Sequence, residues 1–243
     1  MLVLSMSYKE MYDCLESDIP KLNYQRERCL PKICKAFRKE NRFPNYKWIE
    51  YEPSSGNKYL IIYYAPNSLY NDNPFVRYCA IVWNDNYRFV ITWMKGKYKH
   101  PNQHEFEATP MLYVYTNHFF NQYKTRFLKD ELLSSNEVLS RFVMRNLVYT
   151  PIEINEKVNR NISNKDDSYR RGFSVEDGIC FTRYDMDGVF YDIDEKGKDE
   201  VYTLCFIFTT YYNKDKMSAE QIDAISIEEE KAWALYHHVH NRI

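Results

Sequence analysis

Glycine, long apolar runs and signature motifs are what this sequence lacks most clearly. Only 6 of its 243 residues are glycine. No run of 18 apolar residues occurs, so we expect no transmembrane helix. The signatures of P-loop NTPases, dinucleotide-binding folds, α/β-hydrolases and zinc proteases are all missing. No motif in the sequence therefore specifies a reaction or a ligand by itself.

An excess of one charge is also lacking, because 33 basic residues balance 34 acidic residues and the net charge is −1. This balance gives no overall electrostatic reason to bind nucleic acid or an anionic membrane, so any basic site must be local. The first residues, MLVLSMSYKEMYDCLE, contain no basic segment and no small-residue cleavage site. We therefore expect a soluble protein that does not bind membranes.

The six cysteines are scattered, and no CxxC pair occurs among them. This usage favours a reduced, cytoplasmic protein over a disulfide-bonded one. The C-terminal sequence His237-His238-Val239-His240 has no carboxylate or cysteine partner at metal-ligand spacing. We expect no metal and no cofactor.

Aromatic residues are abundant by contrast, with 23 tyrosines and an aromatic fraction of 17%. The apolar fraction of 44% indicates a globular protein with a buried core. Tyrosine favours strands and carries a polar tip on an apolar ring, so it indicates sheet-rich structure and surfaces that contact a partner. The alternative explanation is an AT-rich coding sequence, since Lys, Asn, Ile and Tyr are all frequent.

Helix starts are marked by capping patterns. Ser7 and Glu10 form a Ser-x-x-Glu box before a helix over residues 8–16. A second helix is predicted over about residues 23–39, where Pro31 must kink or divide it. Three later helices are predicted. The first runs from the N-cap Asn117 to about residue 132, and the second from the capping box at 134–137 to about residue 146. The third follows the cap at 218–221, and a break near Ser226 is an alternative for it.

Strands are predicted where β-branched and aromatic residues concentrate. Asn84-Asp85-Asn86 tolerates positive φ and predicts a hairpin between the third and fourth strands. Residues 150–167 are polar and Asn-rich, which predicts an exposed loop. The predicted strands cover residues 46–51, 58–65, 75–83, 87–94, 110–115, 169–175, 179–184, 189–193 and 201–210.

Helices and strands come in runs rather than in alternation, which predicts an α+β fold with mainly antiparallel sheet and segregated helices. Residues 1–116 would form a helical start and a β-rich half whose role the sequence does not indicate. Residues 117–243 would form two helices, a four-stranded meander and a C-terminal helix. One continuous domain is the alternative to this division.

The stretch TNHFFNQYKTRFL, residues 116–128, holds the main candidate site. His118 lies in the first turn of the predicted helix, where the positive helix end favours the neutral imidazole that a general base needs. Arg126 lies on the same ridge at i+8 and could hold a phosphate. The alternative is a capping-region histidine and a boundary arginine on a helix that packs into the core through Phe119, Phe120, Tyr123 and Phe127.

Other arginines could bind phosphate or simply lie on solvated faces. Arg141 and Arg145 lie one helical turn apart and could contact two phosphates. Arg171 adds positive charge where a strand begins. Arg183 could line a cleft with one face of the last strand, formed by Thr203, Cys205, Ile207 and Thr209.

From residue 116 onward, the chain resembles the barnase, colicin and RelE-type endoribonuclease superfamily of bacterial toxins and phage-defence proteins. The features that carry the resemblance are the order helix, helix, four-stranded meander, the spacing His118-x4-Tyr123-x2-Arg126, and the threonines of the last strand. The resemblance covers about half of the chain. It implies RNA cleavage without a metal, with Tyr or Arg as the general acid because no second histidine lies in the helices or the meander.

The leading hypothesis is therefore a metal-independent, RNA-cleaving protein in which His118 is the base and Arg126 the phosphate clamp. Tyr123 or Arg183 would assist, and Arg141, Arg145 and Arg171 would bind substrate. The alternatives are a noncatalytic module that binds a protein or nucleic acid through tyrosine-rich strands, and an immunity or accessory protein encoded beside a toxin.

Overall fold

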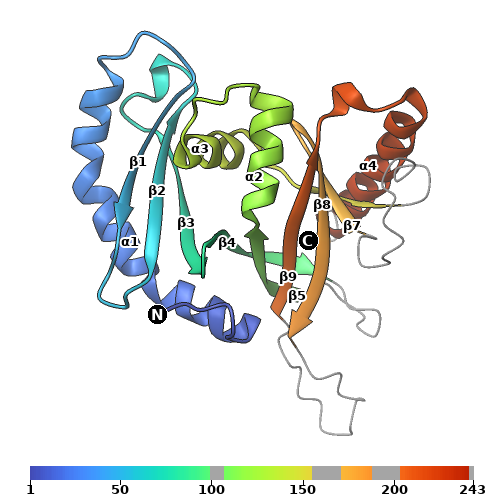
Figure 1. Cartoon of the computed structure of the whole chain (residues 1–243), viewed down its shortest axis with the longest axis horizontal. Helices are drawn as coiled ribbons and strands as arrows, with labels where there is room; N and C mark the ends of the chain where they lie inside the picture. The colour runs from blue at the N-terminus through green and yellow to red at the C-terminus, as the bar shows by residue number, and fades with distance from the viewer. Residues whose placement is uncertain (99–106, 155–170, 188–202, 241–243) are drawn as a thin grey trace, which may run out of the picture.

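The computed structural model describes residues 1–98, 107–154, 171–187 and 203–240. The strands of these residues form one sheet in the order β1-β2-β3-β4-β5-β9-β8-β7-β6. Neighbouring strands are antiparallel, except that β5 and β9 run parallel. Figure 1 shows the helices packed around this sheet. The predicted α+β class with mainly antiparallel sheet is confirmed.

The strands follow the predicted pattern closely at the start of the chain. The hairpin at Asp85 is confirmed, since Asn84 pairs with Tyr87 and Asp85 has a φ of 51°. The bounds are β1 Asn45–Tyr51, β2 Lys58–Ala65, β3 Phe75–Asn84, β4 Tyr87–Tyr98, β5 Glu107–Tyr115, β6 Thr150–Glu153, β7 Arg171–Val175, β8 Gly178–Asp187 and β9 Thr203–Tyr212.

The second half of the sheet differs from the prediction in two ways. β6 occupies the start of the segment predicted as a loop, where it pairs with β7. β8 pairs directly with β9, and the strand predicted at 189–193 lies outside the described residues. The parallel pairing of β5 with β9 joins strands from both sides of residue 117 into the same sheet.

The helices are α1 Tyr8–Phe37, α2 Asn117–Tyr123, α3 Ser135–Arg145 and α4 Ala219–His240. Both predicted capping boxes, at Ser7 and at Ser134, are confirmed by hydrogen bonds in each direction. α4 runs without a break past Ser226, whose hydroxyl donates to the carbonyl of Ile222 one turn earlier.

α1 is one helix rather than the two predicted, although it contains Pro20 and Pro31. Each proline removes one backbone hydrogen bond. The apolar side of the helix is nevertheless buried on both sides of the prolines, at Leu15, Leu22 and Phe37. This packing on the sheet outweighs the lost hydrogen bonds. Figure 1 shows the helix turning from the lower part of the view to its left side.

α2 begins one residue earlier and ends sooner than predicted. Thr116, not Asn117, is the N-cap: its hydroxyl accepts from the backbone N–H of Phe119 at 3.2 Å. The backbone N–H of Thr116 also donates to Phe208 of β9, which fixes where β5 ends. After Tyr123 the chain widens into a π-helical turn, Lys124–Leu128, and Lys129 then stops it with a φ of 52°.

The helices cover both faces of the sheet. α2 and α3 pack on one face, where Phe119 and Phe142 join a large aromatic core with Tyr115 and Phe208. α1 packs on the other face. α4 lies on the same side as α1, because Ile179 and Phe181 contact it while the alternate residue Cys180 faces α2 and α3. These placements leave the ends of β1 to β4 beside the start of α3.

Candidate functional site

His118, the predicted base, is exposed near the start of α2. Its Nε2 lies 2.5 Å from Nε2 of Gln122, one helical turn later. Gln122 therefore lies on the same side of α2 as His118. The imidazole is accessible to solvent, and no titratable side chain is hydrogen-bonded to it among the described residues.

Tyr123 and Arg126 make contacts within the fold. The Tyr123 side chain is fully buried, and its hydroxyl donates to the Asp177 carboxylate at 2.6 Å. Burial and the neighbouring Asp177 charge raise the pKa of Tyr123 far above its usual value. Arg126 donates to the backbone carbonyl of Tyr211 at 2.6 Å and lies over the ring of Tyr212.

Asp177 is the centre of a buried polar cluster in the turn between β7 and β8. Its carboxylate accepts from Tyr123, from Arg145 and from the Asn146 amide. Its backbone N–H donates to the Asn146 amide oxygen at 3.0 Å, and its carbonyl accepts from the Tyr211 hydroxyl. The cluster joins α2, α3, β9 and the turn. Every polar group of Asp177 has a partner, so the cluster is built to hold the fold together.

The remaining predicted arginines lie apart from one another. Arg141 lies over the ring of Tyr46, and Arg171 over the ring of Tyr184. Arg183 is exposed and pairs with Ile207, which faces α1. It therefore lies on the opposite face of the sheet from His118, and the two cannot line one cleft.

The face of β9 predicted to line that cleft is buried in its first half and half-buried after it. Cys205 and Thr203 are buried, and Ile207 packs in the core beneath α1. Thr203 and Cys205 therefore do not line an open cleft, because both faces of this central strand carry a helix. The catalytic and binding roles of the predicted residues stay predictions.

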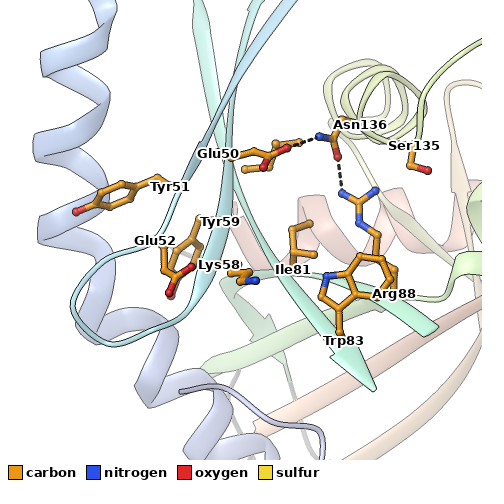
Figure 2. Close-up of a pocket in the computed structure, with 11 residues that line it drawn as sticks. Glu50, Tyr51, Glu52, Lys58, Tyr59, Ile81, Trp83, Arg88, Ser135 and Asn136 are labelled. Carbon is orange, nitrogen blue, oxygen red and sulfur yellow. Dashed lines mark hydrogen bonds between the residues drawn. The ribbon is translucent and has the colours of Figure 1, made fainter. Parts of the chain in front are cut away.

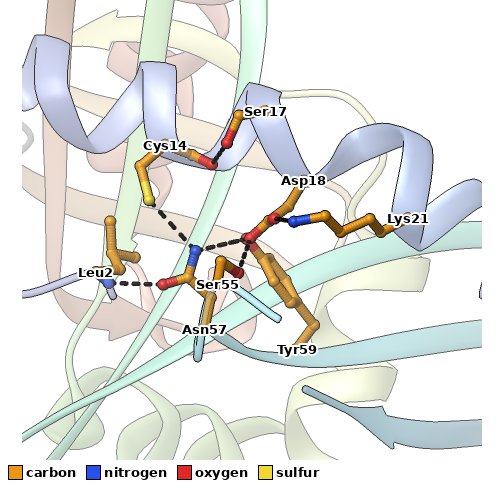
Figure 3. Close-up of polar contacts among 8 residues, drawn as sticks. All are labelled: Leu2, Cys14, Ser17, Asp18, Lys21, Ser55, Asn57 and Tyr59. Carbon is orange, nitrogen blue, oxygen red and sulfur yellow. Dashed lines mark hydrogen bonds and ion pairs between the residues drawn. The ribbon is translucent and has the colours of Figure 1, made fainter. Parts of the chain in front are cut away.

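A second buried carboxylate, Asp18, lies between α1 and β2 (Figure 3). One of its oxygens accepts from Ser55, Asn57 and Tyr59 at 2.6 to 2.9 Å, and the other from Lys21 at 3.0 Å. These four donors satisfy both oxygens. Asp18 is thus another tie within the fold, fastening α1 to the sheet.

An open cleft of about 550 Å³ lies over the ends of β1 to β4 beside the start of α3. We name it the Arg88 cleft. Glu50 and Lys58 approach from β1 and β2, Trp83 and Arg88 from the β3–β4 hairpin, and Asn136 from α3 (Figure 2). The volume falls in the range of small-molecule sites. Charges of both signs and an aromatic ring therefore border one space.

Asn136 organises the polar side of the Arg88 cleft. Its amide nitrogen donates to Glu50 at 3.0 Å, and its amide oxygen accepts from the Arg88 guanidinium at 2.5 Å. Figure 2 shows these three side chains in a row across the cleft. The Asn136 amide thus lies between the Glu50 carboxylate and the Arg88 guanidinium and is hydrogen-bonded to both.

The charge of Arg88 is only partly compensated. The side chain is half-buried, and burial lowers the pKa of its guanidinium. Within the described residues it forms no ion pair with a carboxylate, and its hydrogen-bond acceptor is the neutral Asn136 amide. Such a guanidinium is suited to a carboxylate or phosphate brought by a ligand.

Sequence reasoning did not single out the Arg88 cleft, although one signal for it was present. The hairpin at Asp85 was predicted, and its register places Trp83 opposite Arg88 on one face. An exposed tryptophan paired with an arginine is a candidate contact pair. Asn136 and Glu50 carry no comparable signal, because they reach the cleft only through the packing of α3 against β1.

Comparison with known proteins gives no match: no family model, no curated protein and no solved structure is similar to the chain. The resemblance to endoribonucleases therefore stays a hypothesis from the residues. In the described part of the chain, no group of three His, Cys, Asp or Glu side chains could hold a metal ion. None of the helices there is both long enough and apolar enough to cross a membrane.

Proposed function

We propose that this protein is a noncatalytic binding module whose ligand occupies the Arg88 cleft and presents an anionic group to Arg88. The observation that carries the proposal is the half-buried Arg88 guanidinium, which borders a 550 Å³ space and has a neutral acceptor. A ligand anion would contact the guanidinium directly, whereas Glu50 is linked to it only through the Asn136 amide.

Binding is favoured over catalysis by the groups around the cleft. The described residues that line it include no histidine or cysteine, and the Tyr59 hydroxyl is held by the buried Asp18 carboxylate between α1 and β2. Its charged groups are Glu50, Glu52, Lys58 and Arg88. These groups can orient a ligand through charge and hydrogen bonds. They do not form the nucleophile–base pair that covalent catalysis requires.

The test is a titration with inorganic pyrophosphate, followed by calorimetry and by the shift in melting temperature. We expect saturable binding that Arg88→Ala weakens by about tenfold or more, since charge-assisted hydrogen bonds to a guanidinium are strong. Arg88→Lys should restore part of it. Lys95→Ala, which removes one positive charge from the other face of β4, should bind like the wild type. Equal binding by Arg88→Ala would overturn the proposal.

RNA cleavage by His118 is the second candidate, favoured by the accessible imidazole near the start of α2. Purified protein incubated with total RNA in EDTA distinguishes the two. The binding proposal expects intact RNA from the wild type. Cleavage that His118→Ala abolishes would instead support the endoribonuclease hypothesis and make His118 its base.

A further inference from the structure

Three features of the Arg88 cleft, taken together, restrict the kind of ligand it can take. The first is Trp83, whose side chain borders the cleft and is 57% exposed. A large indole left open to solvent beside a guanidinium is a platform for a flat ring. Trp83 and Arg88 are direct cross-strand partners, so a ring on the indole lies close to an anion on the arginine.

The second feature is a second positively charged side chain, that of Lys58. Lys58 faces the same side of the sheet, because it pairs with Ile81, two residues before Trp83. Lys58 and Arg88 can therefore approach one anionic group from two strands. The start of α3 contributes less, since the Ser134–Glu137 capping box already occupies donors of its first turn.

The third feature is the pair of carboxylates at the β1 side of the cleft, Glu50 and Glu52. They would repel a ligand that is anionic throughout. They would accept hydrogen bonds from a ligand that carries hydroxyl or amino donors beside its anionic group. Glu50 lies close to Arg88, because both are hydrogen-bonded to the Asn136 amide, at 3.0 Å and 2.5 Å.

We infer that the Arg88 cleft binds a nucleotide unit, with its base on Trp83, its phosphate at Arg88 and Lys58, and its sugar or base donors at Glu50 and Glu52. This inference rests on the proposed function and specifies the ligand of that same site. A nucleotide combines the flat ring, the anion and the donors that the three features require. The unit can be a free nucleotide or part of a single strand.

The experiment compares the affinities of AMP, GMP, CMP and UMP with those of pyrophosphate and of a short single-stranded oligoribonucleotide. At least one mononucleotide should bind about tenfold or more tightly than pyrophosphate, because a stacked base adds to the phosphate contact. Trp83→Ala should remove that advantage and leave pyrophosphate binding intact. Trp83→Phe should keep part of it, and Trp233→Ala, at an exposed tryptophan of α4, should change nothing.

The outcomes separate the two proposals. If the oligonucleotide binds more tightly than every mononucleotide, and this binding depends on Arg88, the natural ligand is a single strand. If the oligonucleotide and the best mononucleotide bind with equal affinity, the natural ligand is a free nucleotide. Mononucleotides that bind no better than pyrophosphate, or as well to Trp83→Ala as to the wild type, overturn the nucleotide inference alone. Pyrophosphate binding that does not depend on Arg88 overturns the proposed function as well.

Discussion

Arg145 donates to both carboxylate oxygens of Asp177, with its Nε at 3.0 Å from each and its Nη2 at 2.7 Å from Oδ1. The carboxylate is buried, and the arginine side chain is 33% exposed. The pair fastens α3 to the turn between β7 and β8. The sequence predicts Arg145 as a phosphate contact, whereas in the fold its guanidinium is the counter-charge of a buried aspartate.

Removing this counter-charge should destabilise the protein strongly. Arg145→Ala leaves Asp177 buried with the hydroxyl of Tyr123 and the amide of Asn146 as its side-chain partners. We expect a loss of about 3–5 kcal/mol in the free energy of unfolding, measured by urea denaturation.

The matched control is Arg141→Ala, one turn earlier on α3. Arg141 lies 5.9 Å from the centre of the Tyr46 ring and has no buried carboxylate partner among the described residues. Its removal should cost about 1 kcal/mol or less. Similar losses in the free energy of unfolding for the two variants would show that the Arg145–Asp177 pair contributes no more to stability than Arg141 does.

Tyr123→Phe should destabilise the fold through one missing hydrogen bond. The ring stays, but Asp177 loses the hydroxyl that donates to it at 2.6 Å. We expect a loss of about 1–3 kcal/mol in the same denaturation experiment. Tyr24→Phe, at an exposed tyrosine of α1, should stay within about 0.5 kcal/mol of the wild type. An unchanged midpoint for Tyr123→Phe would contradict this description of the cluster.

We expect the protein to lose stability in acid, because the buried Asp18 carboxylate then becomes protonated. Burial raises the pKa of Asp18, but the hydrogen bonds from Ser55, Lys21, Asn57 and Tyr59 outweigh it, and the net pKa is lowered. The unfolded chain therefore binds the proton more tightly than the folded chain. Stability is present above the unfolded pKa and is lost as the pH falls through the lowered, folded pKa.

Urea denaturation at a series of pH values below about 5 measures this loss. The wild type should lose stability more steeply than Asp18→Asn, which lacks the titrating group and starts from a lower stability. Asp13→Asn, at a mostly exposed carboxylate of the same helix, should keep the wild-type slope. Equal slopes for the wild type and Asp18→Asn would show that the buried carboxylate does not govern acid unfolding.

Much of the fold follows from short-range patterns, and the errors have physical causes. The capping boxes at Ser7 and Ser134 and the hairpin at Asp85 depend on neighbouring residues, so the sequence predicts them correctly. The N-cap at Thr116 depends on contacts with Phe208, and the unbroken α1 depends on burial against the sheet. Such long-range packing leaves no local signature.

The candidate site was less predictable than the fold. The sequence pointed to His118, Tyr123 and Arg126 on one helix and to arginines on other elements. The structure assigns Tyr123 and Arg126 to contacts with Asp177 and Tyr211. The Arg88 cleft combines groups from β1, β2, the β3–β4 hairpin and α3. Only the pairing of Trp83 with Arg88 could be anticipated, because it follows from the hairpin register.

The central claim is that the ligand site is the Arg88 cleft and not the start of α2. The most direct measurement is an NMR titration of isotopically labelled protein with the tightest-binding nucleotide. Spectra of Trp83→Phe, Arg88→Lys and His118→Ala assign the three side-chain signals. We predict that the Trp83 indole and Arg88 guanidinium signals shift together and saturate, while the His118 imidazole signal stays in place. Saturating shifts at His118 with unmoved Trp83 and Arg88 signals would contradict the account.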